Sequence, residues 1–221
     1  MTISSRFPWC YTRTRMLMRL PNAGKLLDVG CGSGDLLRLV KTLKPGLAQH
    51  GTDVYRDAKL PRSVHFFTSN ANEKLNAPDN TYDAVISTHM FEHLEHPERA
   101  IAEVFRVLKP GGKVYIETPS PRSLALPSFR SVNIRENVPI NFYDDPTHLR
   151  PFSARALYQL CTTAGLRVRS AGNVRNWLGV LTAPVTFLLA FILQKRSFLV
   201  HSVWNVFGWS SYAVAEKPRT R

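Results

Sequence analysis

The sequence predicts an α/β fold, a Rossmann-like, doubly wound sheet with helices on both faces. Two observations carry this prediction. Residues 25–120 alternate apolar runs with amphipathic stretches, as βαβ units do. A glycine-rich turn, DVGCGSG at residues 28–34, joins the first apolar run to the first amphipathic stretch. The order of strand, glycine turn and helix is typical of folds that bind a nucleotide-like cofactor.

The first half of the predicted sheet consists of four short apolar runs. KLLDVG at 25–30 is a buried strand that ends in the glycine turn. A helix at 35–43 follows, because its apolar residues recur at helical spacing until KPG at 44–46 ends it. Further strands are expected at 48–54, 64–68 and 82–87.

The second half begins with a helix at 98–108, which KPGG at 109–112 is expected to stop before a fifth strand at 113–117. Residues 119–150 are rich in Pro, Ser and Asn and are expected to form a loop. Ser153 then caps a helix through Cys161. The sixth and seventh strands are expected at 166–174 and 212–216.

The glycine turn is the strongest chemical signal. Glycine lets the backbone approach a ligand closely, and the helix that follows presents N–H groups at its N-terminus. Asp53 comes nineteen residues after Gly34, at the end of the second strand, where an acid can bind the ribose hydroxyls of an adenosine. The alternative is a tight structural turn with an unrelated Asp. The combined order of strand, loop, helix, strand and acid favours the ligand site.

The spacing of the glycines also selects among cofactors. The dinucleotide fingerprint is G-x-G-x-x-G, whereas this chain has G-x-G-x-G with Asp35 at the position of the third glycine. A carboxylate is unfavourable beside a pyrophosphate. It is favourable beside S-adenosylmethionine (SAM), which has no phosphate and carries sulfonium and ammonium groups. We therefore expect SAM as the cofactor.

Three segments resemble the class I SAM-dependent methyltransferases, notably the branch that includes quinone-biosynthesis enzymes: LLDVGCGSG, HMFEHLEHPERAIAEVFRVLKPGG and DDPTHLRPFS. The resemblance covers roughly residues 24–175 and the terminal strand. It implies a seven-stranded sheet with an antiparallel last strand, with the methionine part of SAM at Asp28 and the 30–34 backbone and the ribose at Asp53. The family often has an adenine-binding Asp where this chain has Ala71, so Asn70, Asn72 or backbone groups are expected to substitute. The expected cofactor residues are Asp28, Gly30, Cys31, Gly32, Gly34, Asp53, Ala71, Asn72 and Ser87.

Two segments supply candidate residues for the methyl acceptor. Methyl transfer requires alignment and the exclusion of water, and a hydroxyl acceptor also benefits from a general base. His148, in the polar segment 144–152, is the leading candidate for the base or for orienting the acceptor. A hydrogen-bonded surface turn is the alternative. His93 and Glu92, after the fourth strand, are the next catalytic candidates.

The segment after the fourth strand also has spacing compatible with metal ligation. On a helix, His89, Glu92 and His93 would share one face. Some quinone-pathway relatives carry an E-x-x-E-H metal site here, and His89 replaces its first acid. A histidine cluster without a carboxylate-rich shell is weak evidence for a metal. We therefore expect Glu92 and His93 to brace the helix start, and no metal.

An apolar stretch precedes the seventh strand. Residues 177–193 contain no charge, and aromatic residues are frequent up to Trp209. Relatives usually join these strands by a short hairpin, so 177–209 is expected to be an insertion in a single domain of residues 1–221. Pro184 and the short length argue against a spanning helix. We expect a helical hairpin dipping into one leaflet, with Trp204 and Trp209 at the interface. A buried dimerisation or lid element is the alternative.

Charge is unevenly distributed around a net value of +13. Residues 1–60 carry ten Lys/Arg against four Asp/Glu, residues 61–120 carry six against eight, and residues 121–221 carry thirteen against four. This asymmetry indicates an anionic partner: a membrane surface, a nucleic acid or a phosphorylated substrate. The first residues do not resemble a secretory signal, and the three cysteines suggest neither disulfides nor a zinc site. A cytosolic location is expected.

These observations predict a methyltransferase at the cytosolic membrane face that modifies a lipid-linked or amphipathic acceptor, with an O-acceptor implied by resemblance. A soluble RNA methyltransferase is the first rival, although no RNA-binding module is evident and nucleic acid is disfavoured. A catalytically silent SAM-fold binding protein is the second rival. Homodimerisation is an open possibility.

Overall fold

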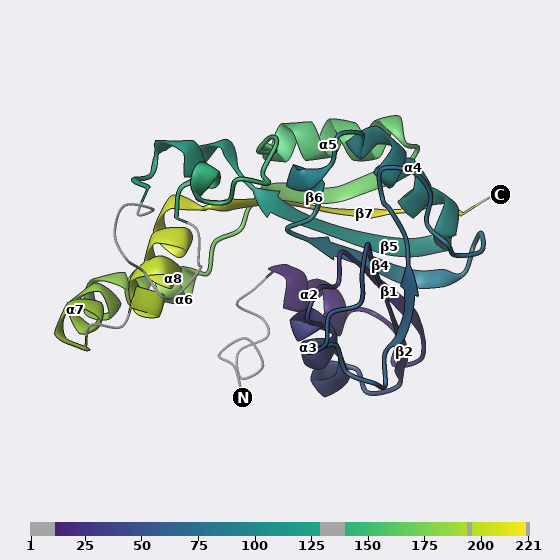
Figure 1. Cartoon of the computed structure of the whole chain (residues 1–221), viewed down its shortest axis with the longest axis horizontal. Coiled ribbons are helices and arrows are strands. Elements are labelled where there is room, and N and C mark those ends of the chain that lie inside the picture. Colours follow the sequence, from purple (N-terminus) through teal and green to yellow (C-terminus); the bar gives the residue numbers. More distant parts are fainter. Residues whose placement is uncertain (1–11, 129–139, 194–195, 220–221) are drawn as a thin grey trace.

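The computed structural model describes residues 12–128, 140–193 and 196–219, and its seven strands form one sheet (Figure 1). The strand order is β3-β2-β1-β4-β5-β7-β6, parallel from β3 to β5, with β7 antiparallel to both β5 and β6. The bounds are β1 Gly24–Val29, β2 Leu47–Asp53, β3 His65–Thr68, β4 Tyr82–Thr88, β5 Leu108–Pro119, β6 Arg167–Asn173 and β7 Ser210–Glu216. The predicted doubly wound α/β fold is confirmed, including its antiparallel last strand.

Helices cover both faces of the sheet (Figure 1). One face carries α2 Thr12–Met18 and α3 Asp35–Leu43, and the other carries α4 Pro97–Val107 and α5 Ala154–Thr163. Leu36, Leu37 and Val40 of α3 are buried, as the helical spacing predicted. The Ser153 side chain accepts a hydrogen bond from the Ala156 amide at 3.1 Å, which confirms the predicted cap of α5.

One helix was not predicted, and one local prediction was wrong. The unpredicted helix, α2, forms because Met16 and Leu17 are buried against the sheet. Its seven residues are too few for a helical pattern to stand out. KPGG was expected to separate α4 from the fifth strand, but β5 begins at Leu108, which pairs with Tyr82 ahead of an irregularity in the ladder. The KPGG segment therefore lies within the strand.

The described residues between 177 and 207 form three helices. These are α6 Trp177–Leu181, α7 Ala183–Leu193 and α8 Arg196–Phe207, and these helices pack on one another beside the end of the sheet (Figure 1). Within the described ranges, each helix is too short or too polar to cross a bilayer.

The expected interfacial positions of Trp204 and Trp209 are corrected by the structure. Trp209 is only 2% exposed, and its indole N–H donates to the Ile140 carbonyl oxygen at 2.6 Å. Trp204 stacks on it, with 4.4 Å between the ring centroids. The two rings fill a small core with Leu126 and Val200, so burial outweighs any interfacial preference. The exposed tryptophan of this unit is Trp177.

Candidate active site

The glycine turn lies at the carboxyl edge of the sheet, beside the point where the strand order reverses between β1 and β4. This is where open α/β sheets bind ligands. Gly30, Gly32 and Gly34 have φ of +77°, +45° and +81°, a region that L side chains rarely adopt. A Cβ at Gly32 would meet nothing within 4 Å, whereas one at Gly30 would come within 2.7 Å of Met90. The turn is therefore packed against Met90 at Gly30, whereas the space beside Gly32 is open.

Asp53 holds this turn in place. One carboxylate oxygen accepts from the Gly32 amide at 3.0 Å, and the other accepts from the Val54 amide at 2.8 Å. Each carboxylate oxygen has more than one lone pair, so both can accept a further hydrogen bond from a ribose hydroxyl. The geometry is compatible with the expected role of Asp53.

Asp28 is a buried acid near the end of β1, two residues before Gly30. It is 2% exposed, and its Oδ1 has no hydrogen-bond partner among the described residues. Burial raises the pKa of Asp28 to about 7, although the positive charge of Arg13 opposes this effect. A buried carboxylate with an unpaired oxygen suits a cationic ligand. The ammonium and sulfonium groups of SAM supply that charge, so the residues present fit the cofactor.

The other expected cofactor residues have varied surroundings. Burial, reinforced by Asp28 and Asp53, raises the pKa of the Cys31 thiol to about 12, and the side chain packs in the core, so only its backbone faces the turn. The fully buried Ser87 hydroxyl donates to the Val29 carbonyl at 3.0 Å and ties β4 to β1. Ala71 and Asn72 follow β3, and the Asn72 side chain accepts from the His96 amide at 3.1 Å. None of these contacts excludes a backbone or amide contact to adenine.

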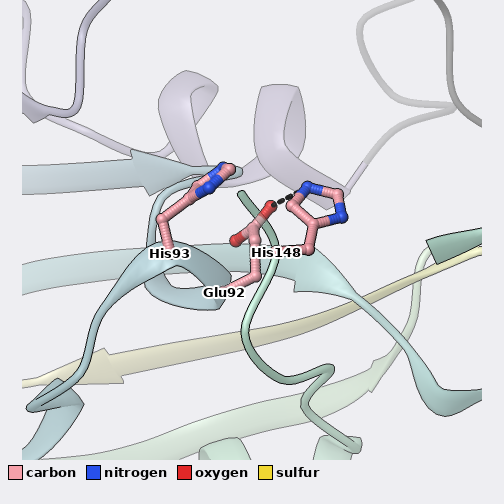
Figure 2. Close-up of side chains that lie close together, drawn as sticks. All are labelled: Glu92, His93 and His148. Carbon is pink, nitrogen blue, oxygen red and sulfur yellow. Dashed lines mark ion pairs between the residues drawn. The ribbon is translucent and has the colours of Figure 1, made fainter. Parts of the chain in front are cut away.

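Glu92, His93 and His148 come together although they are far apart in the sequence. Figure 2 shows the Glu92 carboxylate between the two imidazole rings. One potential ligand atom from each residue lies within 4.8 Å of the others, and His148 Nε2 is 4.0 Å from Glu92 Oε1. The three leading catalytic candidates therefore form one cluster.

Hydrogen bonds orient both imidazoles. The His148 Nδ1–H donates to the Phe142 carbonyl at 2.6 Å, and the His93 Nδ1–H donates to the Thr147 carbonyl at 3.2 Å. Each ring therefore keeps its basic lone pair on Nε2. Burial raises the pKa of nearby Asp145, but hydrogen bonds from Thr147 and the proximity of His148 and His93 outweigh this effect and hold the pKa below its ordinary value.

Glu92 is completely buried, and both its carboxylate oxygens lack a hydrogen-bond partner among the described residues. A buried carboxylate in this state is costly unless it shares a proton or binds a cation. The cluster can therefore move a proton between Glu92 and His148, or ligate a divalent ion through Glu92, His93 and His148. This ligand set differs from the one considered from sequence, because His148 takes the place of His89.

His89 lies outside a helix, contrary to the spacing argument, since only a single 3₁₀ turn, η2 Phe91–His93, forms here. His89 has φ of +55°, unusual for a residue with a side chain. Its ring lies 3.4 Å from Glu92 and 3.7 Å from Glu117. Burial lowers its pKa, but the two carboxylates raise it more, so the net shift of the pKa is upward.

Two charged residues near the site were missed from sequence: Glu117 and Arg13. Glu117 had a signal, an acid within the apolar run of β5 at the carboxyl edge. Arg13 Nη1 lies 4.0 Å from Glu117 Oε2. Nothing in the sequence indicated Arg13, because its position depends on how α2 packs.

Comparisons with known proteins show which family the chain belongs to. A family model described as a methyltransferase domain matches residues 6–171. A probable S-adenosylmethionine-dependent methyltransferase of Mycolicibacterium smegmatis is 32% identical over 159 residues, which cover 70% of this chain and 56% of that protein. A ubiquinone/menaquinone biosynthesis C-methyltransferase of Desulfotalea psychrophila is 31% identical over 128 residues, covering 54% of this chain and 52% of that protein. The matches thus span about half the length of these relatives.

A solved structure of the complex between the Haloferax volcanii Trm112 methyltransferase activator and a methyltransferase also matches. It has a TM-score of 0.64 at 20% identity and covers 98% of this chain and 92% of that chain. At this identity the likeness shows the fold alone. The family match, the open glycine turn and the two acids beside it lead to one conclusion: the chain belongs to the methyltransferase-domain family and has the class I fold of SAM-dependent methyltransferases.

Proposed function

We propose that this methyltransferase modifies a hydroxyl of an amphipathic or lipid-linked acceptor, which it takes up at a membrane surface. The observation that carries the proposal is an exposed apolar surface on α6 and α7, which extend away from the sheet (Figure 1). Eight large apolar side chains there are at least 36% exposed: Trp177, Leu178, Leu181, Val185, Phe187, Leu188, Leu189 and Ile192.

A bilayer suits this surface better than a protein groove does. The sequence of α7 is apolar on all sides rather than along one stripe, as expected of a helix surrounded by protein on one side and by acyl chains on the other. Residues 121–221 carry thirteen Lys/Arg against four Asp/Glu, a charge that favours anionic headgroups. Lys195, the first cation after the apolar run, lies outside the described residues.

The apolar helices connect to the catalytic edge. Trp204 of α8 stacks on Trp209, and their ring centroids lie 6.3 and 5.6 Å from that of His89. A bilayer that holds α6 and α7 would therefore lie close to the catalytic edge of the sheet. The relatives named as ubiquinone/menaquinone biosynthesis C-methyltransferases support an amphipathic acceptor, although their names give carbon, not oxygen, as the methylated atom.

The cluster of Glu92, His93 and His148 would handle the acceptor proton. SAM, when bound, supplies a methyl group that is already activated on sulfur. The lone pair of His148 Nε2 can accept the hydroxyl proton, because Nδ1–H is held by Phe142. Glu92 then stabilises the charged imidazolium, and His93 helps to orient the acceptor.

Flotation with vesicles that contain anionic lipid tests the membrane step. The triple variant Leu181→Gln, Leu188→Gln, Ile192→Gln removes side chains that are 77%, 59% and 61% exposed. We expect it to lose most vesicle binding while keeping SAM affinity. Tyr158→Gln on α5, at a site that is 49% exposed, is the matched control and should float like the wild type. Equal flotation of all three proteins would contradict the membrane role.

The acceptor class is tested with labelled SAM and fractionated lipids, nucleic acids and small metabolites. The proposal predicts label in an amphipathic or lipid fraction, attached to oxygen in the isolated product. Label confined to RNA would establish the rival function. A wild type that ignores vesicles, together with a variant that converts a dimer into a monomer, would assign the apolar surface to dimerisation.

A further inference from the structure

The sheet has a second concave surface beside α2. Figure 1 shows α2 on one face of the sheet and α5 on the other. Tyr115 of β5 packs with Met16 and Leu17 of α2, so Lys113, two residues earlier on the strand, points to the same face. A cavity of about 510 Å³ lies on this face, between the end of α2 and strands β5, β6 and β7. A space of this size suits a small-molecule ligand.

Four cations from three elements line this cavity: Arg15 and Arg19 at the end of α2, Lys113 of β5 and Arg169 of β6. The ladder between β6 and β7 shifts its register between Val168 and Ser170, which leaves Arg169 as an extra residue. A bulge of this kind redirects a side chain. The cation cluster exists only in the folded chain, because its members are far apart in the sequence.

The acid in the lining, Glu216, does not neutralise this cluster. Glu216 accepts a hydrogen bond from Arg169 and forms an ion pair with it. That hydrogen bond and the charges of Arg169 and Lys113 hold the pKa of Glu216 below its ordinary value, although burial raises it. The ion pairs among the described residues do not include Arg15, Arg19 or Lys113. Three positive charges in the cavity are therefore left without a counter-charge.

These three cations also have hydrogen-bonding capacity to spare. The Arg15 guanidinium donates to the Thr12 hydroxyl at 3.3 Å, and the Lys113 ammonium donates to the Arg19 carbonyl at 3.5 Å. Both contacts are long for a hydrogen bond to a cation. Like charges around one space repel one another, and an anion between them would remove this repulsion and use the remaining donors.

The rest of the lining suits the organic part of an anionic ligand. Met16, Tyr212 and Val214 supply apolar surface, and Ser170 supplies a hydroxyl. Tyr212 stacks on Tyr115, with 6.2 Å between the ring centroids and 11° between the planes, so one ring face is fixed in the sheet. The cavity thus combines a cationic side with an apolar side.

We propose that this cavity binds a phosphomonoester, with Arg15, Arg19 and Lys113 around the phosphate and Tyr212 beside the organic group. A phosphomonoester suits the three cations better than a carboxylate does, because it carries about two negative charges and three strong acceptor oxygens. Its binding would join α2 to β5 and stabilise the folded chain. The lining contains none of the residues of the glycine turn or of the cluster of Glu92, His93 and His148. The inference is therefore independent of the acceptor proposed above.

Calorimetry with glycerol 3-phosphate tests the site, because this probe is soluble and carries the phosphomonoester group alone on a small organic body. We expect saturable binding to the wild type and weakening by about tenfold in Arg19→Gln and in Lys113→Gln. Glycerate, which has a carboxylate in place of the phosphate group, should bind at least about tenfold more weakly than the probe. Arg155→Gln removes an exposed charge from α5 on the opposite face of the sheet and is the matched control, with unchanged affinity.

Thermal unfolding keeps the test independent of misfolding. Without ligand, Arg19→Gln and Lys113→Gln should melt no lower than the wild type, because they remove charges that repel their neighbours. The probe should raise the melting temperature of the wild type and leave that of the double variant unchanged. A wild type that does not bind the probe would overturn the proposal. Equal affinity for glycerate, or an equal loss in Arg155→Gln and Arg19→Gln, would overturn it as well.

Flotation distinguishes the two sources of a phosphomonoester, a soluble metabolite and a lipid headgroup. Phosphatidic acid carries a phosphomonoester, whereas phosphatidylglycerol carries a phosphodiester. If the ligand is a headgroup, the wild type prefers vesicles with phosphatidic acid over phosphatidylglycerol vesicles of equal surface charge, and Lys113→Gln loses this preference. If the ligand is soluble, the calorimetric result holds and the two vesicles bind equally. The calorimetric test contains no membrane, so its failure is distinguishable from failure of the membrane proposal.

Discussion

At the residue scale, the buried Asp28 links cofactor binding to stability. The pKa of Asp28 is about 7 in the folded chain because of burial, against an ordinary value of 3.8. Between about pH 4 and 7 the folded chain keeps a proton that the unfolded chain releases. The free energy of unfolding therefore falls as the pH rises through this window, by roughly 4 kcal/mol at about 1.4 kcal/mol per pKa unit.

We predict that Asp28→Asn stabilises the cofactor-free protein at pH 8 and flattens its pH dependence between about pH 4 and 7. The same variant weakens SAM binding, because the ammonium group loses its carboxylate partner. Urea unfolding across this pH range measures the effect. Asp35→Asn, at a side chain that is 88% exposed, is the control and should change stability by less than about 0.5 kcal/mol. A variant with the pH profile of the wild type would contradict the assignment.

A second prediction at the residue scale concerns His148, the proposed general base. We predict that His148→Ala lowers turnover by about 10²–10⁴-fold while SAM affinity changes little, because His148 lies among acceptor-side residues. Single-turnover kinetics and calorimetry measure the two quantities. His96→Ala, which removes a ring half-exposed beside Glu98, serves as the control. Unchanged turnover would remove His148 from the mechanism and leave Glu92 and His93.

The sensitivity of turnover to a chelator distinguishes proton transfer from metal ligation as the role of this cluster. If Glu92, His93 and His148 act on protons alone, turnover is insensitive to EDTA. If they hold a divalent ion, EDTA abolishes turnover and added metal restores it, and Glu92→Gln weakens metal binding measured directly by calorimetry. Both possibilities are examined because the Glu92 carboxylate is buried and its two oxygens accept no hydrogen bond from the described residues.

At the element scale, α8 anchors the apolar helices to the sheet. The Gly208 carbonyl accepts from the Ser120 hydroxyl at 3.0 Å, and Trp209 packs against Val200 of α8, Leu126 and Ile140. Asn176 joins α6 to α8, because its amide donates to the Asn205 side chain at 3.1 Å. Deleting all of 177–209 would therefore remove part of the core as well as the exposed surface.

We predict that Trp209→Ala lowers the free energy of unfolding by about 3–5 kcal/mol, because it leaves a cavity and an unpaired Ile140 carbonyl. Trp177→Ala is the matched control: the same change at a site 68% exposed should cost less than about 0.5 kcal/mol. Urea unfolding of both variants measures the difference. Similar losses in the two would contradict the division into a buried anchor and an exposed surface.

At the scale of the whole molecule, the excess of positive charge permits both a membrane and a nucleic acid as partner. Arg15, Arg19 and Lys113 line a cavity of about 510 Å³ between α2 and the β6–β7 end of the sheet, away from the catalytic cluster. Repeating the flotation experiment at low and high salt distinguishes a membrane partner from a nucleic acid. Salt should weaken vesicle binding without abolishing it, because apolar burial is not screened. Binding that high salt removes entirely would indicate nucleic acid.

The sequence by itself determined the fold class and the cofactor, and it predicted which residues of the glycine turn bind that cofactor. These follow from local patterns: apolar periodicity places strands and helices, and the glycines with Asp53 require a fixed spacing along the chain. His148 was also singled out, from a polar loop expected at the carboxyl edge of the sheet.

Tertiary structure alone decided which acceptor-side residues meet. Glu92 and His148 are 56 residues apart in the numbering, and their approach depends on how the loop after β5 folds back over η2. Arg13 reaches the acids only because α2 packs through Met16 and Leu17. Trp209 looked interfacial in sequence and became core, because burial depends on neighbours distant along the chain. Spacing constrains contacts within an element, whereas contacts between elements are set by packing.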